Sequence, residues 1–406
     1  MKKKLLSILL LATLVLSLAA CGTKEKDPAD VSGGNDTNQT ADATDDVKVG
    51  TENEDANSED TTNEETDKTE ETTPAAEGYE LALVTDVGTI NDKSINQGAW
   101  EGLEAYAVEK GITHKYYQPS EKTTAAYIDT IGLAVEGGAK VVVCPGFLFE
   151  EAVFETQNTY PDVKFIILDG QPHDKDYTDF TIKENVYSIF YAEEQAGFLA
   201  GYAAVKDGYK KLGFMGGMAV PAVIRFGYGF VQGAEYAAKE LGITGLEVMY
   251  HYTGGFDATP EVQSTAAAWY QNGTEVIFAC GGAVGNSVMS AAEAAGTKVI
   301  GVDVDQSAES ETVITSSMKG LSSSVYGALE QYYAGTFPGG IIASLDVTVD
   351  GVGLPMETSK FNTFAQADYD AIYAKLVAGE IALLKDTDVT AVTEITLENT
   401  TVTFVE

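Results

Sequence analysis

Short apolar runs recur along residues 79–406, and a longer segment with helical periodicity follows each of them. The runs are continuous rather than alternating, which is typical of strands that are covered on both faces in a parallel sheet. They are 81-LALVT-85, 141-VVVC-144, 164-KFIILD-169, 211-KLGFMG-216, 276-VIFAC-280 and 298-KVIGVD-303. This alternation predicts an α/β protein with doubly wound parallel sheets.

Two blocks of the chain repeat the same order of elements. Helical segments are predicted at 96–111, 123–138, 229–242 and 261–273. Gly111 and Gly242 end the first and the third of them, as expected at helix C-termini. The blocks, residues 79–190 and 210–310, share an architecture without repeating a sequence. We therefore expect two α/β lobes.

Polar residues and glycines gather directly after the predicted strands. They comprise Asp86, 145-PGFLFEE-151, 216-GGM-218, 254-GGFDA-258, 281-GGAVG-285 and 303-DVDQ-306. Ligands of open parallel sheets bind outside the carboxyl ends of the strands, so two lobes whose strand ends face each other would enclose a ligand. The most polar stretch, 85-TDVGTINDKSINQGAW-100, is expected to form one wall. It offers Asp86, Asn91, Asp92, Lys93, Ser94 and Asn96 as hydrogen-bonding side chains.

Motifs that would indicate an enzyme, a metal site or a cofactor are weak. The string 227-GYGFVQG-233 lies inside a helical pattern and lacks dinucleotide-binding spacing, so it predicts close helix packing. His114, His173 and His251 lack the spacing of metal ligands. The sequence also has no GxSxG elbow and no Cys/His pair at a strand end. We predict no cofactor, no metal and no catalytic residue.

The first twenty residues have the pattern of a lipoprotein signal peptide. Three lysines precede the apolar run at 5–16, and a small-residue close follows, 17-SLAACG-22. This lipobox-like close predicts that Cys21 is lipidated and becomes the mature N-terminus. An uncleaved membrane anchor is the alternative, but the run is short for a span. The chain is thus expected on the extracytoplasmic face of a cell membrane, held there by lipid.

The segment after the signal peptide is acidic and nearly free of apolar residues. Residues 22–78 contain eighteen Asp plus Glu, four Lys and no aromatic residue. Such a segment cannot bury enough apolar surface to offset its ordering entropy, so we expect a disordered tether. The whole chain carries a net charge of −37, which makes nucleic acid or an anionic membrane surface a poor partner.

The remaining two cysteines end apolar runs. A free thiol in that position behaves as a small buried hydrophobe. With Cys21 assigned to lipid, Cys144 and Cys280 do not make a disulfide framework, and we expect both to be unpaired.

Five motifs together resemble the basic membrane protein family of lipoproteins. They are 85-TDVGTINDKSINQGAWEG-102, 145-PGFLFEEAV-153, 254-GGFD-257, 299-VIGVDVDQ-306 and 314-ITSSMK-319. Characterised members are substrate-binding components of ABC importers and bind purine nucleosides. The resemblance spans residues 79–406 and implies a type I periplasmic binding protein fold, two α/β lobes joined by crossover strands.

This fold suggests a division of the chain. We expect a signal peptide at 1–20 and the lipidated cysteine with its tether at 21–78. The first lobe would comprise 79–190 with about 320–345. The second lobe would comprise 191–319 with about 346–406.

The resemblance also implies a set of ligand contacts. Asp86 would bond the base from the first lobe, assisted by an acidic residue that we take as Glu151. Phe256 would stack on the base from the second lobe, and an aromatic face contributes about 1–3 kcal/mol per base. Asp303 would accept hydrogen bonds from two ribose hydroxyls, as a carboxylate can. Lys319 would donate a hydrogen bond beside it.

Four further positions complete the predicted site. Gly282 would allow close backbone approach, and Asn91 adds a polar group from the first loop. Ile95 departs from the family pattern, which has Phe there, so one face of the base would meet an aliphatic wall and lose the quadrupolar part of stacking. Phe147 or Phe149 is a candidate for the missing ring.

Three functions fit these features. The first is a receptor that closes on a nucleoside and delivers it to an ABC permease and its ATPase. The second is a nucleoside hydrolase that uses Asp86 and Asp303 as acid and base. The third is a binding protein that signals to a sensor. Without an activated nucleophile or a metal cluster the receptor is favoured, and we predict that the protein is not an enzyme.

Overall fold

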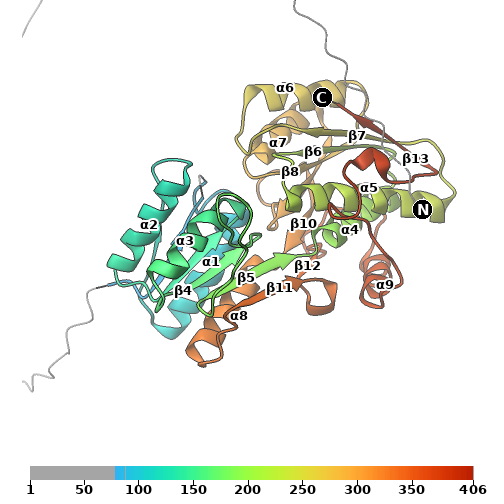
Figure 1. The fold of residues 1–406 in the computed structure, drawn as a ribbon. Helices are drawn as coiled ribbons and strands as arrows, with labels where there is room; N and C mark the ends of the chain where they lie inside the picture. The colour runs from blue at the N-terminus through green and yellow to red at the C-terminus, as the bar shows by residue number, and fades with distance from the viewer. Residues whose placement is uncertain (1–77, 87, 406) are drawn as a thin grey trace, which may run out of the picture. The chain divides into compact units, whose positions relative to one another are not determined.

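The computed structural model describes residues 78–86 and 88–405, which form two β-sheets flanked by helices (Figure 1). The strands of the first sheet are β1 (Leu81–Val84), β2 (His114–Tyr117), β3 (Val141–Pro145), β4 (Lys164–Leu168), β5 (Val186–Tyr191) and β11 (Ile341–Leu345). Their order is β11-β5-β4-β3-β1-β2. All neighbouring strands in this sheet are parallel.

The second sheet is also wound in both directions from its centre. Its strands are β6 (Lys211–Gly216), β7 (Leu246–Tyr252), β8 (Val276–Cys280), β9 (Lys298–Asp303), β10 (Val313–Lys319), β12 (Val352–Gly353) and β13 (Thr400–Phe404). Their order is β12-β10-β9-β8-β6-β7-β13, and β12 runs antiparallel to β10. The predicted α/β class with doubly wound parallel sheets is confirmed.

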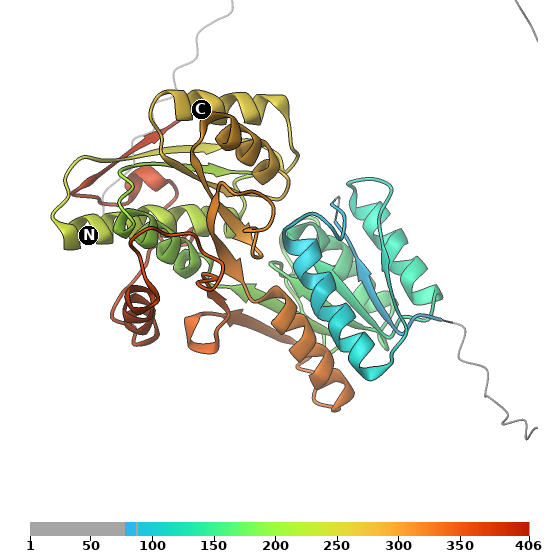
Figure 2. The ribbon, with the colours of Figure 1, turned by 180° about the vertical axis from the view of Figure 1, so that it is seen from behind.

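Helices cover both faces of each sheet. The first sheet carries α1 (Ile95–Lys110), α2 (Thr124–Glu136), α3 (Glu150–Thr159), α8 (Leu321–Tyr333) and the short η1 (Phe147–Phe149). Its apolar side chains pack against α1 and α8 on one face and against α2 and α3 on the other. Figure 2 shows α1 and α8 side by side, as their mutual packing requires.

The second sheet is covered in the same way. Its helices are α4 (Glu193–Lys206), α5 (Pro221–Leu241), α6 (Pro260–Gln271), α7 (Val284–Ala295) and α9 (Gln366–Val377), with the short η2 (Val347–Val349) and η3 (Val392–Glu394). One face packs against α4 and α5, and the other packs against α6 and α7.

Local sequence signals set several helix ends. The hydroxyl of Thr259 accepts a hydrogen bond from the N–H of Val262 at 3.2 Å, and Pro260 occupies the first turn of α6. Both features are favoured at helix N-termini. Gly111 and Gly242 end α1 and α5 with φ of 67° and 65°, which glycine adopts without a Cβ clash.

The chain passes three times between the two sheets. The first passage is at Ala192, between β5 and α4, and the second is at Gly320, between β10 and α8. The third is residues 346–351, between β11 and β12. The passages lie together, since the N–H of Ala192 donates to the Leu345 carbonyl at 3.0 Å and the N–H of Gly320 donates to the Gly351 carbonyl at 2.8 Å.

Glycines allow α4 and α5 to cross with their backbones in contact. A Cβ on Gly197 or Gly201 would overlap a carbonyl oxygen of α5, and a Cβ on Gly229 or Gly233 would overlap a carbonyl oxygen of α4. The glycine-rich string 227–233 therefore packs two helices together, as the sequence predicted.

Two further observations bear on the predictions. Cys144 and Cys280 are both free and buried. None of the helices in the described part of the chain is long and apolar enough to cross a membrane. The signal peptide, Cys21 and the tether to residue 77 lie outside the described residues, so those predictions stand as they were made.

Candidate functional site

A cavity lies at the carboxyl ends of strands from both sheets. It contains about 950 Å³ of empty space, part of it open to solvent. The first sheet and its loops contribute Asp86, Gly88, Asp92, Ser94, Ile95, Asn96, Gly146, Phe147 and Asp169. The second contributes Val220, Pro221, Ala222, Val223, Phe226, Phe256, Asp257, Cys280, Gly281, Gly282, Ala283, Val302, Asp303 and Lys319.

Asp86 is held in place by the buried side chain of Asn96. The Asn96 side-chain amide donates to Asp86 Oδ1 at 2.8 Å and to Asp92 Oδ2 at 2.7 Å, and its carbonyl accepts from the N–H of Asp86 at 3.1 Å. The N–H of Gly88 also donates to Asp86 Oδ1, at 2.7 Å. Asp86 Oδ1 is therefore fully engaged. Its other oxygen, Oδ2, stays available to a ligand.

Asp92 caps helix α1, so the hydroxyl of Ser94 is not needed as a cap. Its carboxylate accepts from the N–H groups of Ser94, Asn96 and Gln97 at 2.9, 3.1 and 3.0 Å. An Asp side chain that accepts from the first turn satisfies amides that have no partner within the helix. Because Asp92 does this, the Ser94 hydroxyl is free to donate to Asp303 Oδ2, across from the other sheet.

Burial raises the pKa of both Asp86 and Asp92 above the ordinary value. For Asp86, the N–H of Gly88, the Asn96 amide and the charge of Lys122 oppose this effect without cancelling it. For Asp92, the Asn96 side chain and three backbone N–H groups oppose it. Desolvation disfavours a buried carboxylate, so these two groups ionise less readily than exposed aspartates.

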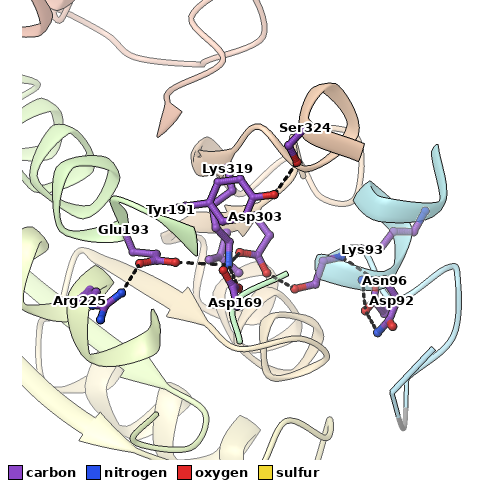
Figure 3. Close-up of polar contacts among 12 residues, drawn as sticks. Asp92, Lys93, Asn96, Asp169, Tyr191, Glu193, Arg225, Asp303, Lys319 and Ser324 are labelled. Carbon is purple, nitrogen blue, oxygen red and sulfur yellow. Dashed lines mark hydrogen bonds and ion pairs between the residues drawn. The ribbon is translucent and has the colours of Figure 1, made fainter. Parts of the chain in front are cut away.

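A second polar group in the cavity is a buried lysine among three carboxylates (Figure 3). Lys319 Nζ lies 2.5 Å from Asp169 Oδ2, 3.1 Å from Asp303 Oδ1 and 4.0 Å from Glu193 Oε1. Burial alone would lower the pKa of Lys319, but Asp169, Asp303 and Glu193 outweigh it and raise this pKa well above the usual range. The lysine is therefore positively charged in this cluster.

The two aspartates beside Lys319 have spare acceptor capacity. Asp169 follows β4 and Asp303 ends β9, and both have left-handed backbones, with φ of 52° and 67°. Asp169 Oδ1 and Asp303 Oδ1 are buried without a hydrogen-bond partner in the described structure, although Asp303 Oδ1 is within ion-pair distance of Lys319. Buried acceptors without donors are rare, and unusual backbone conformations at such positions often mark functional sites.

Aromatic and aliphatic side chains form the remaining walls. Phe147 approaches from the first sheet and Phe256 from the second, and Ile95 also lines the cavity. Phe149 does not, because it is buried in the core with its ring 4.8 Å from that of Tyr127. Of the two candidates for the missing ring, Phe147 is the one that the structure brings to the cavity.

Most of the predicted site residues meet in this cavity. Those that line it are Asp86, Ile95, Phe147, Phe256, Gly282, Asp303 and Lys319. Asn91 does not line it. This residue is exposed in the turn before α1, where its N–H donates to the hydroxyl of Thr89 at 3.2 Å.

Glu151 also lies away from the cavity. Its carboxylate accepts from the Thr124 hydroxyl at 2.7 Å. The preceding residue, Glu150, accepts from the N–H of Gln171 at 2.8 Å and so supports the loop that carries Asp169. One residue corresponds to a rotation of about 100° on a helix, which is why neighbouring glutamates at the start of α3 serve different partners.

Sequence reasoning missed several residues that line the cavity. Asp92, Ser94 and Asn96 belong to the polar loop that it singled out, but it gave them no ligand role. Asp169 ends one of the apolar runs, and its position at the carboxyl end of a strand was a usable signal. Phe226 had none, since it lies within the helical pattern of α5.

The described residues hold no cluster suited to a metal. Within residues 78–86 and 88–405, no group of three or more His, Cys, Asp and Glu side chains is arranged to bind an ion. Cys280 lines the cavity, but burial, followed by the charge of Asp303, raises its pKa well above the usual range. Its thiol is therefore neutral and a poor nucleophile.

Comparison with known proteins gives one consistent result. Residues 79–385 match the family described as ABC transporter substrate-binding protein PnrA-like. The ABC transporter nucleoside-binding protein BmpA of Lactococcus lactis is 31% identical over 321 residues, which are 73% of this chain and 87% of that protein. Basic membrane protein D of Borreliella burgdorferi is 28% identical over 305 residues, which are 74% and 84% of the two chains.

Solved structures agree on the fold. An ABC transporter solute-binding protein from Aeropyrum pernix K1 superposes with a TM-score of 0.65 at 24% identity, covering 76% of this chain and 93% of that one. A solute-binding protein from Conexibacter woesei has a TM-score of 0.61 at 24% identity, covering 76% and 99%. The predicted type I periplasmic binding protein fold is thereby confirmed.

Proposed function

Because this chain belongs to the PnrA-like family of ABC transporter substrate-binding proteins, we propose that its cavity binds a purine nucleoside for delivery to a membrane permease. Members of this family bind and hand over a ligand and are not enzymes, so the hydrolase alternative is set aside. The observation that carries the proposal is the distribution of carboxylates. Asp86 is bound to Asn96 at the start of α1 in one part of the cavity wall, and Asp169 and Asp303 are paired with Lys319 in another.

The part of the cavity with Asp86 suits a purine base. Asp86 Oδ2 can accept one N–H from the edge of the base, while Oδ1 remains bound to Gly88 and Asn96. Phe256 offers a ring from one side. Phe147 offers a second ring that compensates for the aliphatic side chain of Ile95. Stacking on an aromatic side chain contributes about 1–3 kcal/mol per base.

The part of the cavity with Lys319 suits a ribose. Ionised carboxylates only accept hydrogen bonds, and Asp169 and Asp303 each have an oxygen without a donor. Two neighbouring ribose hydroxyls can supply these donors, and Lys319 can donate to an oxygen of the same sugar. Gly282, with φ of 53°, lets the chain turn close to the ligand without a side chain.

The charge of the cavity argues for a nucleoside and against a nucleotide. Five aspartates line it, Asp86, Asp92, Asp169, Asp257 and Asp303, and among the lining residues Lys319 is the cation. A phosphate group would add negative charge to an already acidic site, and like charges in close contact are costly.

The N-terminal predictions complete the proposal. We infer that residues 1–20 direct export and that Cys21, which is outside the described residues, carries the lipid anchor. The protein would then act on the extracytoplasmic face of the membrane, with an ABC permease and its ATPase as partners. Palmitate labelling of the wild-type chain and of a Cys21→Ala variant tests the anchor, and labelling of both would contradict it.

Equilibrium dialysis with a panel of ligands tests the ligand class. The panel contains inosine, guanosine, adenosine, cytidine, ribose and inosine 5′-monophosphate. We expect micromolar or tighter binding of at least one purine nucleoside. The monophosphate should bind about a hundredfold more weakly than inosine, a difference of ~2.7 kcal/mol. Equal binding of cytidine or ribose, or no binding at all, would overturn the proposal.

A further inference from the structure

The ion pairs around Lys319 continue away from the cavity. Glu193 Oε1 lies 4.0 Å from Lys319 Nζ, and Glu193 Oε2 lies 3.7 Å from a guanidinium nitrogen of Arg225. The Arg225 guanidinium in turn contacts both carboxylate oxygens of Asp386, at 2.6 and 3.3 Å. Figure 3 shows Glu193 between the lysine and the arginine. A row of alternating charges thus links the cavity to the C-terminal segment.

Glu193 is the buried centre of this row. Its side chain is 0% exposed, and neither of its oxygens has a hydrogen-bond partner within the described structure. A buried carboxylate is costly unless opposite charges compensate it. Burial and the charge of Asp169 raise the pKa of Glu193 well above the usual range, and Lys319 from β10 and Arg225 from α5 oppose this rise without cancelling it. Because both cations interact with the same carboxyl group, a movement of either one changes how strongly Glu193 attracts the other.

The row also crosses the place where the chain passes between the sheets. Glu193 is the first residue of α4, directly after the passage at Ala192, and Lys319 directly precedes the passage at Gly320. Arg225 lies in the first two turns of α5, next to Phe226, which lines the cavity. Two of the four charged residues, Glu193 and Lys319, thus adjoin segments that connect the two lobes.

Asp386 is the outermost member and does not line the cavity. It follows α9 along the chain and lies one residue beyond the end of the family match at 385. Nothing in the family resemblance assigns it a role. Its two-point contact with Arg225 fixes a planar guanidinium in one orientation.

We propose that Asp386, Arg225 and Glu193 are positioning residues for Lys319, so that the C-terminal segment adjusts ligand affinity without touching the ligand. Without the charge of Asp386, Arg225 is free to move onto Glu193. Glu193 then holds Lys319 less strongly, and Lys319 pairs more closely with Asp169 and Asp303, where it competes with ligand hydroxyls. The identity of the ligand in this argument rests on the proposed function.

A mutant cycle on the full-length chain tests the proposal. The variants are Asp386→Asn, Glu193→Gln and the double variant. The matched control is Asp388→Asn, because Asp388 lies in the same segment and accepts from the N–H of Lys385 at 3.0 Å. Inosine affinity is measured by isothermal titration. The ammonium signal of Lys319 is followed by nitrogen NMR in the unliganded protein.

The proposal predicts that Asp386→Asn weakens inosine binding about three- to tenfold, and that Asp388→Asn leaves it within about twofold. The double variant should bind no more weakly than Glu193→Gln alone, because the effect of Asp386 passes through Glu193. The proposal would be overturned if the losses of affinity in the two single variants multiplied in the double variant, or if Asp386→Asn bound inosine as tightly as the wild type.

The NMR measurement separates this proposal from the proposed function. If the wild-type protein fails to bind any nucleoside, the proposed function is wrong. A displaced Lys319 signal in Asp386→Asn, with no displacement in Asp388→Asn, still supports the positioning row. An identical Lys319 signal in both variants overturns the row whatever the ligand.

Discussion

Replacing Lys319 by methionine would remove the central cation of the cavity while keeping a side chain of similar length. The lysine is buried with Asp169 at 2.5 Å, Asp303 at 3.1 Å and Glu193 at 4.0 Å. Removing one partner of a buried ion pair costs about 3–5 kcal/mol, because it leaves uncompensated buried charge. We expect the free energy of unfolding at pH 7, measured by urea titration, to fall by about this amount.

A second lysine provides a matched control. Lys93 pairs with Glu309 at 3.1 Å, but their side chains are 36% and 31% exposed. Ion pairs that solvent reaches typically contribute at most about 1 kcal/mol. Lys93→Met should therefore lower the free energy of unfolding by less than that amount in the same assay.

The loss of stability in Lys319→Met should depend on pH in a defined direction. The raised pKa of Lys319 means that its contribution to stability is complete below the ordinary lysine pKa, about 10.4, and is lost only as pH rises through the higher folded value. In Lys319→Met, Glu193 loses a cation that opposes the raised pKa of its carboxyl. It then takes up a proton at higher pH, so part of the lost stability should return between pH 7 and pH 5. A loss below about 1 kcal/mol, equal at both pH values, would refute this reasoning.

Three other substitutions test the walls of the cavity and the fold. Burial raises the pKa of Asp86, so on acidification inosine affinity should begin to fall at a pH above the ordinary Asp pKa of about 3.9. Asp86→Asn should bind inosine more weakly at neutral pH, and its affinity should not fall further on acidification. Titrations at several pH values check both expectations. Phe147→Leu should weaken inosine binding about tenfold, or ~1.4 kcal/mol. Adding Ile95→Phe to this variant should restore the affinity, as measured by dialysis, because either position can then supply the second ring that stacks on the base. Gly233→Ala should cost about 1–3 kcal/mol of stability in urea titrations because its Cβ would meet the Phe198 carbonyl, whereas Gly327→Ala, with open space around it, should gain about 0.5–1 kcal/mol; equal effects would contradict the packing argument.

The parts of the fold that followed from the sequence were those with a strong periodic signal. The continuous apolar runs became β1, β3, β4, β6, β8 and β9, which lie mostly inside the two sheets. Strand β2, with the sequence HKYY, lies at a sheet edge and is half exposed, so it lacks such a run. Strand β11 is also an edge strand that leaves Ile341 and Ile342 exposed. Its pairing with β5 comes from tertiary contacts that no local pattern encodes.

The site shows the same division. The rule that ligands bind at strand ends located Asp86 and Asp303, because Asp86 lies just beyond β1 and Asp303 is the last residue of β9. Sequence reasoning assigned a ligand contact to Glu151 and could not reveal that this carboxylate faces the Thr124 hydroxyl instead of the cavity, since that depends on the rotation of α3 against α2. It also could not separate Phe147 from Phe149, because their different burial follows from the turn at Gly146, whose φ is 109°.

The row from Lys319 to Asp386 was beyond sequence reasoning for a further reason. Its members come from four segments that are far apart along the chain, and each charge taken alone resembles a surface residue. Only the fold reveals that Glu193 is buried between two cations. Buried charges of this kind can be identified from their contacts in the folded structure, but not from the residues next to them in the sequence.

Isothermal titration of inosine into the full-length protein, Asp303→Asn and Asp305→Asn tests the central claim most directly. Asp303 lines the cavity, whereas Asp305 does not, since its carboxylate accepts from the N–H of Ser307 and the hydroxyl of Thr358. We predict micromolar or tighter binding by the wild-type protein and by Asp305→Asn, and a loss of about a hundredfold or more in Asp303→Asn. Equal heats from all three proteins, or no heat from the wild type, would contradict the account.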